Sequence, residues 1–156
     1  MSKKVFYFES EESIEDIVKS IFDMDIALDG GWGYGQSDAI MIKEKDTDIK
    51  QLEHTIASMR THLEMSITQK ATQRYGGINL TEISRSELRD GGDYYEKVTY
   101  KITAILEHQY NDFIEEYKEQ YGQKDFDISD YFRRRKAATN EREETLWFLV
   151  SHEPSC

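Results

Sequence analysis

The sequence contains little that would divide the chain or cross-link it. Its 156 residues include one cysteine, Cys156, and one proline, Pro154. A single thiol excludes an internal disulfide, so the fold does not require an oxidising compartment. Because no linker interrupts the chain, we predict one domain over residues 1–152 and a loose tail over residues 153–156.

Long apolar runs and leader-like segments are also missing. No stretch of the sequence approaches the ~20 apolar residues that are needed to span a bilayer. The first residues become acidic by Glu9, which is too early for a secretory signal peptide. We therefore expect a cytoplasmic protein that does not associate with a membrane.

Positive charge is scarce relative to negative charge. The chain has 31 Asp and Glu residues against 20 Lys and Arg residues, which gives a formal net charge of −11. A chain with this charge repels the phosphate backbone, so direct binding to nucleic acid is not expected. The same charge favours solubility and a fast encounter with a basic protein.

The clearest helix signal lies between Asp48 and Gln69. Asp48 is suited to cap the helix start, and Gln51 stands where a capping-box partner belongs. We expect an apolar stripe to pack on strands and the opposite face to be exposed to water. The stripe consists of Ile49, Leu52, Ile56, Met59 and Leu63. The charged residues assigned to the opposite face are Lys50, Glu53, Arg60 and Glu64.

Five strands are predicted from alternating hydrophobicity and β-forming residues. They are Val5–Glu9, Ala39–Ile42, Ile78–Ile83, Tyr94–Leu106 and Thr145–Ser151. The strand from Tyr94 to Leu106 alternates apolar and polar residues, which is typical of an antiparallel sheet with one covered face, and Ile78–Ile83 is its expected partner. The strand from Thr145 to Ser151 is apolar on both faces, so we expect a central strand buried from both sides.

Three further helices are predicted from caps and apolar periodicity. The first begins after Ser13 and runs to about Leu28, and the glycines at 30 and 31 end it. The other two begin at Asn111 or Asp112 and at Asp127 or Ser129, and they end at Gly122 and at about Thr139.

Two glycine pairs complete the pattern, because Tyr75-Gly76-Gly77 and Asp90-Gly91-Gly92-Asp93 are predicted as turns. The resulting order is β-α-β-α-β-β-α-α-β. It predicts an α+β fold with two layers, in which helices pack on one face of a mostly antiparallel sheet of about five strands.

The segment Gly30 to Asp38 is the most unusual loop, since it holds four of the nine glycines. Glycines allow a backbone to approach a ligand closely, and aromatic rings can stack on one. We therefore take Trp32, Gly33, Tyr34 and Asp38 as candidate ligand-binding residues. The loop follows a helix and opens a strand, which is the reverse of a dinucleotide-binding fingerprint.

The same loop has a partial likeness to nucleotidyltransferases. Those enzymes place a Gly-Ser turn before a strand that begins Ser-Asp-x-Asp, and the two carboxylates of that motif bind a divalent metal ion. Ser37 and Asp38 match the start of that strand motif. Ile40 stands where the second carboxylate belongs, however, and Trp32 stands where the serine belongs. No family is recognised from these residues, and Asp38 alone stays a candidate.

Other catalytic and metal-binding patterns are missing from the sequence. His54 and His62 lie eight residues apart on the main predicted helix, and no zinc or calcium spacing is complete. The only cysteine is terminal, and no serine stands in a nucleophile elbow. We therefore assign no catalytic residue, no metal ligand and no cofactor.

A single dense basic run, Arg133, Arg134, Arg135 and Lys136, stands out against the acidic background. These cations suit a helix C-terminus, and they are candidates for binding a phosphate or an acidic partner. The alternative is that they pair with acids just downstream, namely Glu141, Glu143 and Glu144.

Two functional hypotheses follow. The first is a small acidic protein-interaction module that inhibits or regulates a basic, nucleic-acid-processing partner, since immunity and anti-defence proteins often have this size and charge. The second is a protein or enzyme that binds a small molecule or nucleotide through the loop from Gly30 to Asp38. Self-association through an exposed part of the apolar stripe of the main predicted helix, between Asp48 and Gln69, is compatible with either hypothesis.

Overall fold

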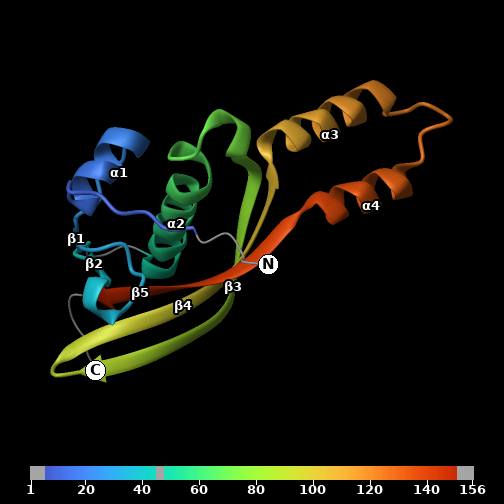
Figure 1. Ribbon diagram of the computed structural model, residues 1–156. Coiled ribbons are helices and arrows are strands. Elements are labelled where there is room, and N and C mark those ends of the chain that lie inside the picture. Colours follow the sequence, from blue (N-terminus) through green and yellow to red (C-terminus); the bar gives the residue numbers. More distant parts are fainter. Residues whose placement is uncertain (1–5, 45–47, 151–156) are drawn as a thin grey trace, which may run out of the picture.

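Five strands form one sheet in the computed structural model, which describes residues 6–44 and 48–150 (Figure 1). The strand order is β1-β2-β5-β4-β3, and every neighbouring pair is antiparallel except β2 and β5. The strands are β1 (Leu28–Gly30), β2 (Ile40–Ile42), β3 (Tyr75–Asp90), β4 (Asp93–Leu106) and β5 (Asn140–Val150). The α+β class and the mostly antiparallel sheet are confirmed.

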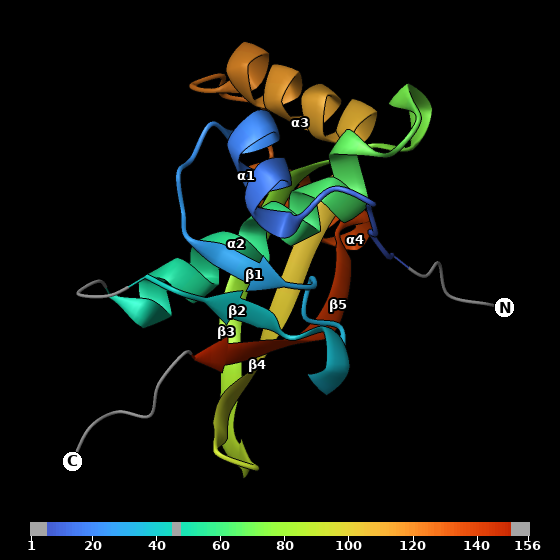
Figure 2. The same ribbon diagram turned by 90° about the vertical axis from the view of Figure 1, so that its left-hand side faces the viewer.

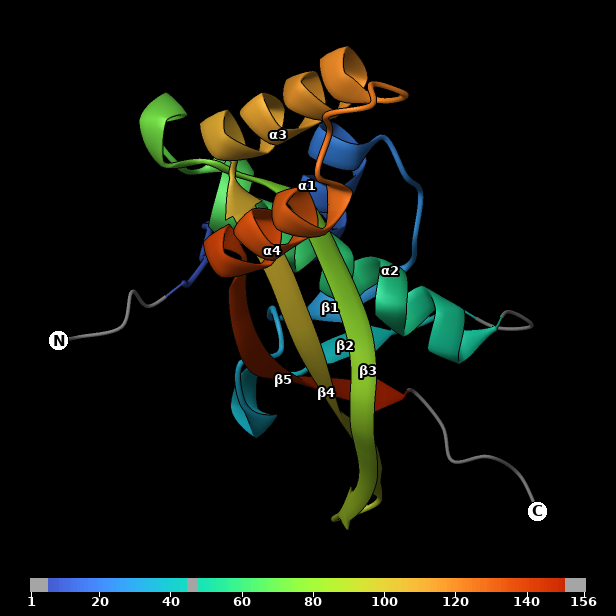
Figure 3. The ribbon, with the colours of Figure 1, turned by 90° about the vertical axis from the view of Figure 1, so that its right-hand side faces the viewer.

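Four α-helices accompany the sheet, and they occupy two regions. They are α1 (Ile14–Phe22), α2 (Ile49–His62), α3 (Glu107–Gln120) and α4 (Ile128–Ala138). The helices α1 and α2 lie on one side of the sheet, and α2 continues into a π-helical turn, Leu63–Ile67 (Figure 1). The helices α3 and α4 lie beside each other and project from the ends of β4 and β5, as Figures 1 and 3 both show.

The N-terminal order differs from the prediction. Residues 6–10 form no strand, although Phe6 and Phe8 pack against the core. Ser13 caps α1 as predicted, but the helix ends at Phe22, because Asp23 adopts a left-handed conformation with φ of 55°. Leu28, where this helix was predicted to end, instead begins β1, which pairs with β2 (Figure 2).

The glycines at 76 and 77 do not reverse the chain as predicted, since both lie within β3. The pairing of β3 with β4 is irregular between Gly76 and Asn79, and a side chain on Gly77 would meet the ring of Tyr110 at 2.8 Å. These glycines therefore allow α3 to approach the sheet closely. The turn predicted at Asp90-Gly91-Gly92-Asp93 is confirmed.

The core lies between the sheet and the two helices that cover it. Val98, Tyr100 and Ile102 from β4 are buried there with Leu146 and Phe148 from β5. The strand β5 is central, as predicted, but only one of its faces is fully buried, because Trp147 and Leu149 are half-buried. The helix α3 begins at Glu107, directly after β4, so it lacks the side-chain cap predicted at Asn111 or Asp112.

Candidate functional site

The loop between β1 and β2 holds the four residues that were predicted to bind a small ligand. The carboxylate of Asp38 accepts hydrogen bonds from the backbone N–H groups of Tyr34 and Gly35, at 3.3 and 2.7 Å. Its backbone carbonyl accepts a third bond, from the N–H of Gly33 at 2.8 Å. Asp38 therefore organises the loop from inside.

The two aromatic residues of this loop point into the protein. Trp32 is buried and meets Phe8 edge to face, with ring centroids 5.3 Å apart. The hydroxyl of Tyr34 accepts a hydrogen bond from the N–H of Phe8 at 2.8 Å and donates one to Glu64 at 2.5 Å. Because these groups already have partners within the fold, the ligand-binding hypothesis for the loop stays a prediction without a contact to support it.

Replacing Asp38 with alanine is expected to lower the free energy of unfolding by ~2 kcal/mol, because two charge-assisted hydrogen bonds to the backbone are lost. Denaturant unfolding followed by circular dichroism measures this loss. Ser37→Ala, at the exposed neighbouring position, is the matched control and should unfold like the wild type. If Asp38→Ala unfolded like the control, Asp38 would not organise the loop.

A cluster of four charged side chains lies beneath Tyr34. Arg60 of α2 and Glu64 of the π-helical turn that follows it are fully buried, which corrects their predicted exposure to water. Glu64 accepts a hydrogen bond from Arg142 at 2.9 Å, and Arg60 lies 3.5 and 3.6 Å from carboxylate oxygens of Glu64 and Glu144. Arg142 also pairs with Glu144, so two cations balance two anions.

The environment of this cluster supports a structural role. The guanidinium of Arg60 donates a hydrogen bond to the carbonyl oxygen of Trp32 at 3.1 Å and lies over the ring of Tyr34. Burial, and then the nearby carboxylate of Glu64, raise the pKa of the Tyr34 hydroxyl well above its ordinary value. Tyr34 therefore stays neutral and forms a hydrogen-bond bridge between the loop, the π-helical turn after α2 and the N-terminal segment.

A second charged cluster joins α2 to the long β3–β4 hairpin. Arg85 of β3 donates hydrogen bonds to Glu53 at 2.8 Å and to Glu82 at 3.2 and 2.8 Å, and it also pairs with Glu96. Glu53 is buried rather than exposed to water as predicted, and its second oxygen has no hydrogen-bond partner among the described residues. Three carboxylates thus share one guanidinium.

Burial raises the pKa of Glu53 to about 7, although Arg85 opposes this shift. The pKa of Arg85 is itself raised, mainly by its hydrogen bonds to Glu82. The two shifts agree physically, because one cation stays charged beside three carboxylates while the most buried of them takes up a proton most easily.

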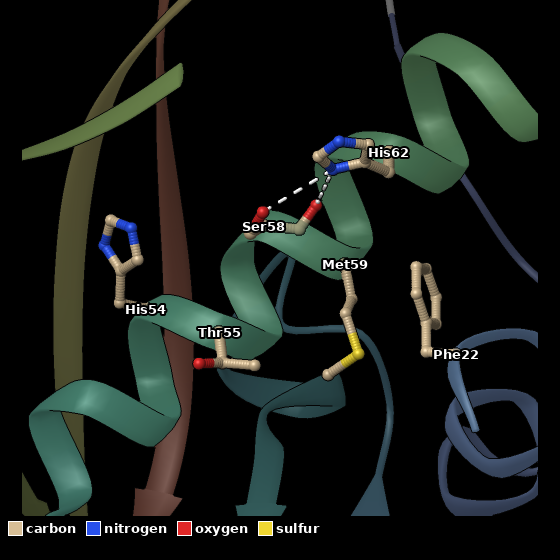
Figure 4. A pocket seen from close by; sticks show the side chains of 6 residues that line it. All are labelled: Phe22, His54, Thr55, Ser58, Met59 and His62. Carbon is tan, nitrogen blue, oxygen red and sulfur yellow. Dashed lines mark hydrogen bonds between the residues drawn. The ribbon is translucent and has the colours of Figure 1, made fainter. Parts of the chain in front are cut away.

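A shallow pocket of about 390 Å³ lies between α1 and α2 (Figure 4). Phe22, Met59 and His62 line it together with His54, Thr55 and Ser58. The Nδ1 atom of His62 lies 2.8 Å from the backbone carbonyl oxygen of Ser58, so this nitrogen carries a proton and donates it. Among residues 6–44 and 48–150, no three His, Cys, Asp or Glu side chains form a group suited to a metal ion.

A strongly acidic region surrounds α1. Eight acidic residues stand between positions 9 and 29 against one cation, Lys19, and all eight are exposed. Some of them line a groove of about 400 Å³, which we call the acidic groove. Its lining includes Glu15, Asp16, Asp25 and Glu44 beside the apolar side chains of Met24 and Ile26.

One of the apolar side chains that line the groove is exposed. Met24 is 38% exposed, whereas Ile26 is buried at the base of the groove lining. Lys19 forms an ion pair with Asp25 at 2.5 Å, and both side chains are largely exposed to solvent. The groove therefore combines apolar contact area with an excess of negative charge. The sequence alone did not predict it, because the acids come from α1, from the segment that follows α1 and from the segment that follows β2.

The basic run assigned to partner binding lies on α4, far along the sequence from the acidic groove. Arg134 pairs with Glu116 of α3 and with Asp130, and Arg133 also pairs with Asp130. The guanidinium of Arg135 lies over the ring of Tyr110. The predicted alternative partners were the downstream glutamates, but two of these pair elsewhere, Glu141 with Lys101 and Glu144 with Arg142.

Comparisons with known proteins supply no relative from which a function could be inferred. The chain matches no protein-family model, no curated protein and no solved structure at a significant level. No helix within the described ranges is both long and apolar enough to cross a membrane.

Proposed function

We propose that the protein is an acidic interaction module that binds a basic protein partner through the acidic groove and thereby inhibits or regulates it. The observation that carries this proposal is the groove itself, where four carboxylates surround apolar side chains. Apolar anchors ringed by charge are the arrangement that gives a protein interface both affinity and specificity.

The overall charge supports a basic partner. The net charge of −11 attracts a positively charged surface over a distance, and the eight exposed acids around α1 concentrate that field on one region. Proteins that process nucleic acid carry basic surfaces, because they must hold phosphate groups. Covering such a surface with the acidic groove would block access of the nucleic acid and inhibit the partner.

Capture from lysate at low salt, followed by binding of the purified partner, tests this proposal. The double variant Glu15→Lys/Asp25→Lys is expected to weaken binding by at least about tenfold, because like charges then face each other. The matched control is Glu87→Lys/Asp93→Lys, which makes the same change in net charge on exposed residues of the β3–β4 hairpin and should bind normally.

The identity of the partner decides the rest of the proposal. A basic protein that binds in a one-to-one complex, and whose activity on nucleic acid falls when the chain is added, supports it. The proposal fails if no basic partner is captured, or if both double variants weaken binding equally.

A further inference from the structure

The outer half of β3, residues 81–90, lies at the edge of the sheet (Figure 3). Within the described part of the chain, β3 pairs with β4 on one side and with no strand on the other. Of residues 81–90, Arg85 alone is not exposed. The guanidinium of Arg85 is therefore the part of this stretch that extends into the body of the protein.

The pairing of β3 with β4 is irregular near the start of this stretch. The register shifts between Glu82 and Ser84, whereas residues 84–90 pair with residues 93–99 without a further shift. Such an irregularity interrupts the ladder of backbone hydrogen bonds and allows the strand to bend. Residues 84–90 can therefore separate from the sheet as a unit while the inner half of β3 stays paired.

Arg85 connects this stretch to α2 through Glu53. It donates a hydrogen bond to Glu53 at 2.8 Å, and the side chains of Arg85 and Glu53 are 15% and 0% exposed. Asp90 also accepts a hydrogen bond from Gln36 at 2.7 Å, but this bond is exposed, so water competes for it. The bond between Arg85 and Glu53 is therefore the buried attachment of the stretch to α2.

The charge on Glu53 decides how favourable this attachment is. Glu82 and Glu96 bind the same guanidinium. With a proton on Glu53, one cation faces two anions and the buried carboxyl is neutral. Without that proton, three carboxylates share one cation, and the second oxygen of Glu53 has no hydrogen-bond partner among the described residues. Burial of a charge that is paired so incompletely is costly.

The direction of the pH dependence follows from the burial of Glu53. Burial raises the pKa of Glu53 from 4.5 to about 7 in the folded protein. When residues 84–90 separate from α2, Glu53 meets water and returns to its ordinary pKa. The attachment is therefore strongest below pH 4.5, and it weakens as the pH rises through about 7.

We propose that Arg85 and Glu53 form a pH-sensitive latch, in which a proton on Glu53 holds the outer half of β3 against α2 and loss of that proton releases it. Charged and titratable groups face Glu53 from three elements: Glu82 and Arg85 of β3, Glu96 and Tyr100 of β4, and Lys50 and His54 of α2. The latch lies outside the acidic groove and does not depend on the proposed function.

Amide hydrogen exchange of the full chain tests the latch between pH 5 and pH 8. After correction for the intrinsic exchange rates, the protection of residues 84–90 is expected to fall by roughly 50- to 100-fold over this range, as the change in the pKa of Glu53 requires. These residues should also be less protected than residues 40–42 of β2 at every pH, because they open without global unfolding.

Three variants identify the group that titrates. Glu53→Gln should keep residues 84–90 protected at pH 8 and remove the pH dependence, because its side chain carries no charge. Glu87→Gln makes the same change on an exposed residue of β3 and should behave like the wild type. His54→Gln should also behave like the wild type, and it is needed because histidine side chains commonly titrate near neutral pH.

Three results would overturn the latch. The first is a protection of residues 84–90 that stays constant between pH 5 and pH 8 in the wild type. The second is a pH dependence that persists in Glu53→Gln and disappears in His54→Gln. The third is equal protection of residues 84–90 and residues 40–42, which would show that the outer half of β3 opens only when the whole protein unfolds.

Discussion

Arg60→Met is expected to lower the free energy of unfolding by about 3 to 5 kcal/mol, because it leaves the carboxylates of Glu64 and Glu144 to share a single cation, Arg142. Arg60 is fully buried, donates a hydrogen bond to the carbonyl of Trp32 and lies 3.5 Å from Glu64, which is itself buried. Methionine fills a similar apolar volume but cannot balance the charge. For a chain of this length the loss corresponds to a fall of about 10 °C in the melting temperature.

Thermal and denaturant unfolding measure this effect, and Arg134→Met is the matched control. Arg134 donates more hydrogen bonds to carboxylates than Arg60 does, but its side chain is exposed on α4. Water can therefore solvate the carboxylates that Arg134 leaves behind when it is replaced. The control should therefore unfold close to the wild type. Equal losses for the two variants would mean that the cluster beneath Tyr34 is solvated rather than buried.

Glu53→Gln is expected to stabilise the protein at about pH 8 by ~3 kcal/mol and to leave its stability near pH 4.5 unchanged. The pKa of Glu53 rises from 4.5 to about 7 on folding, mainly through burial. The folded state therefore binds more protons than the unfolded state between these values. The contribution of the protonated Glu53 carboxyl to the free energy of unfolding is complete below pH 4.5. It is lost as the pH rises through about 7.

The groups that surround Glu53 require a difference measurement. Arg85 and Glu82 face it from β3, Glu96 and Tyr100 from β4, and Lys50 and His54 adjoin it on α2. Subtracting the variant's pH profile of unfolding free energy from that of the wild type isolates Glu53 from them. Parallel profiles would show that Arg85 keeps Glu53 charged.

Glu82→Gln is the control variant for this experiment, because its effect on stability should depend on pH in the opposite direction. The hydrogen bonds from Arg85 lower the pKa of Glu82 in the folded protein. Its contribution is therefore present above its unfolded pKa and is lost as the pH falls, which is opposite to the effect of Glu53. Opposite slopes for the two variants would confirm that one guanidinium holds one charged carboxylate and one easily protonated carboxylate.

The burial of these charges marks the limit of what the sequence alone could predict. Periodicity placed Ile56, Met59 and Leu63 correctly in the core, and Asp48 caps α2 as expected. The same reasoning placed Glu53, Arg60 and Glu64 in water, because it allowed α2 only one buried face. Their partners, Arg85, Arg142 and Glu144, lie on strands far along the chain, and local spacing carries no information about such pairs.

The N-terminal segment and the glycines at 76 and 77 show a second limit. Local propensity read aromatic residues as a strand and paired glycines as a turn. In the structure Phe6 and Phe8 instead pack as side chains against the core, and Tyr110 occupies the space beside the two glycines. Both outcomes depend on tertiary contacts that override local preference.

The candidate functional surfaces could also be predicted only in part from the sequence. The net charge follows from composition alone, and it suggested a basic partner. The acidic groove could not be predicted from the sequence, because only the fold brings Glu15 and Glu44 together. The basic run on α4 was visible as a motif, whereas its partners Glu116 and Asp130 were not. The residues chosen in the glycine-rich loop, such as Asp38, proved to be tied into the loop itself.

The association rate constant of the purified complex, measured over a range of salt concentrations, tests the proposed role of the acidic groove most directly. We predict that the rate constant of the wild type falls steeply as salt increases, and that Glu15→Lys/Asp25→Lys removes most of this dependence. The contradicting result is a rate constant that keeps its salt dependence in that variant and loses it when Arg133 and Lys136 are replaced. That result would place the partner on α4 instead of the acidic groove.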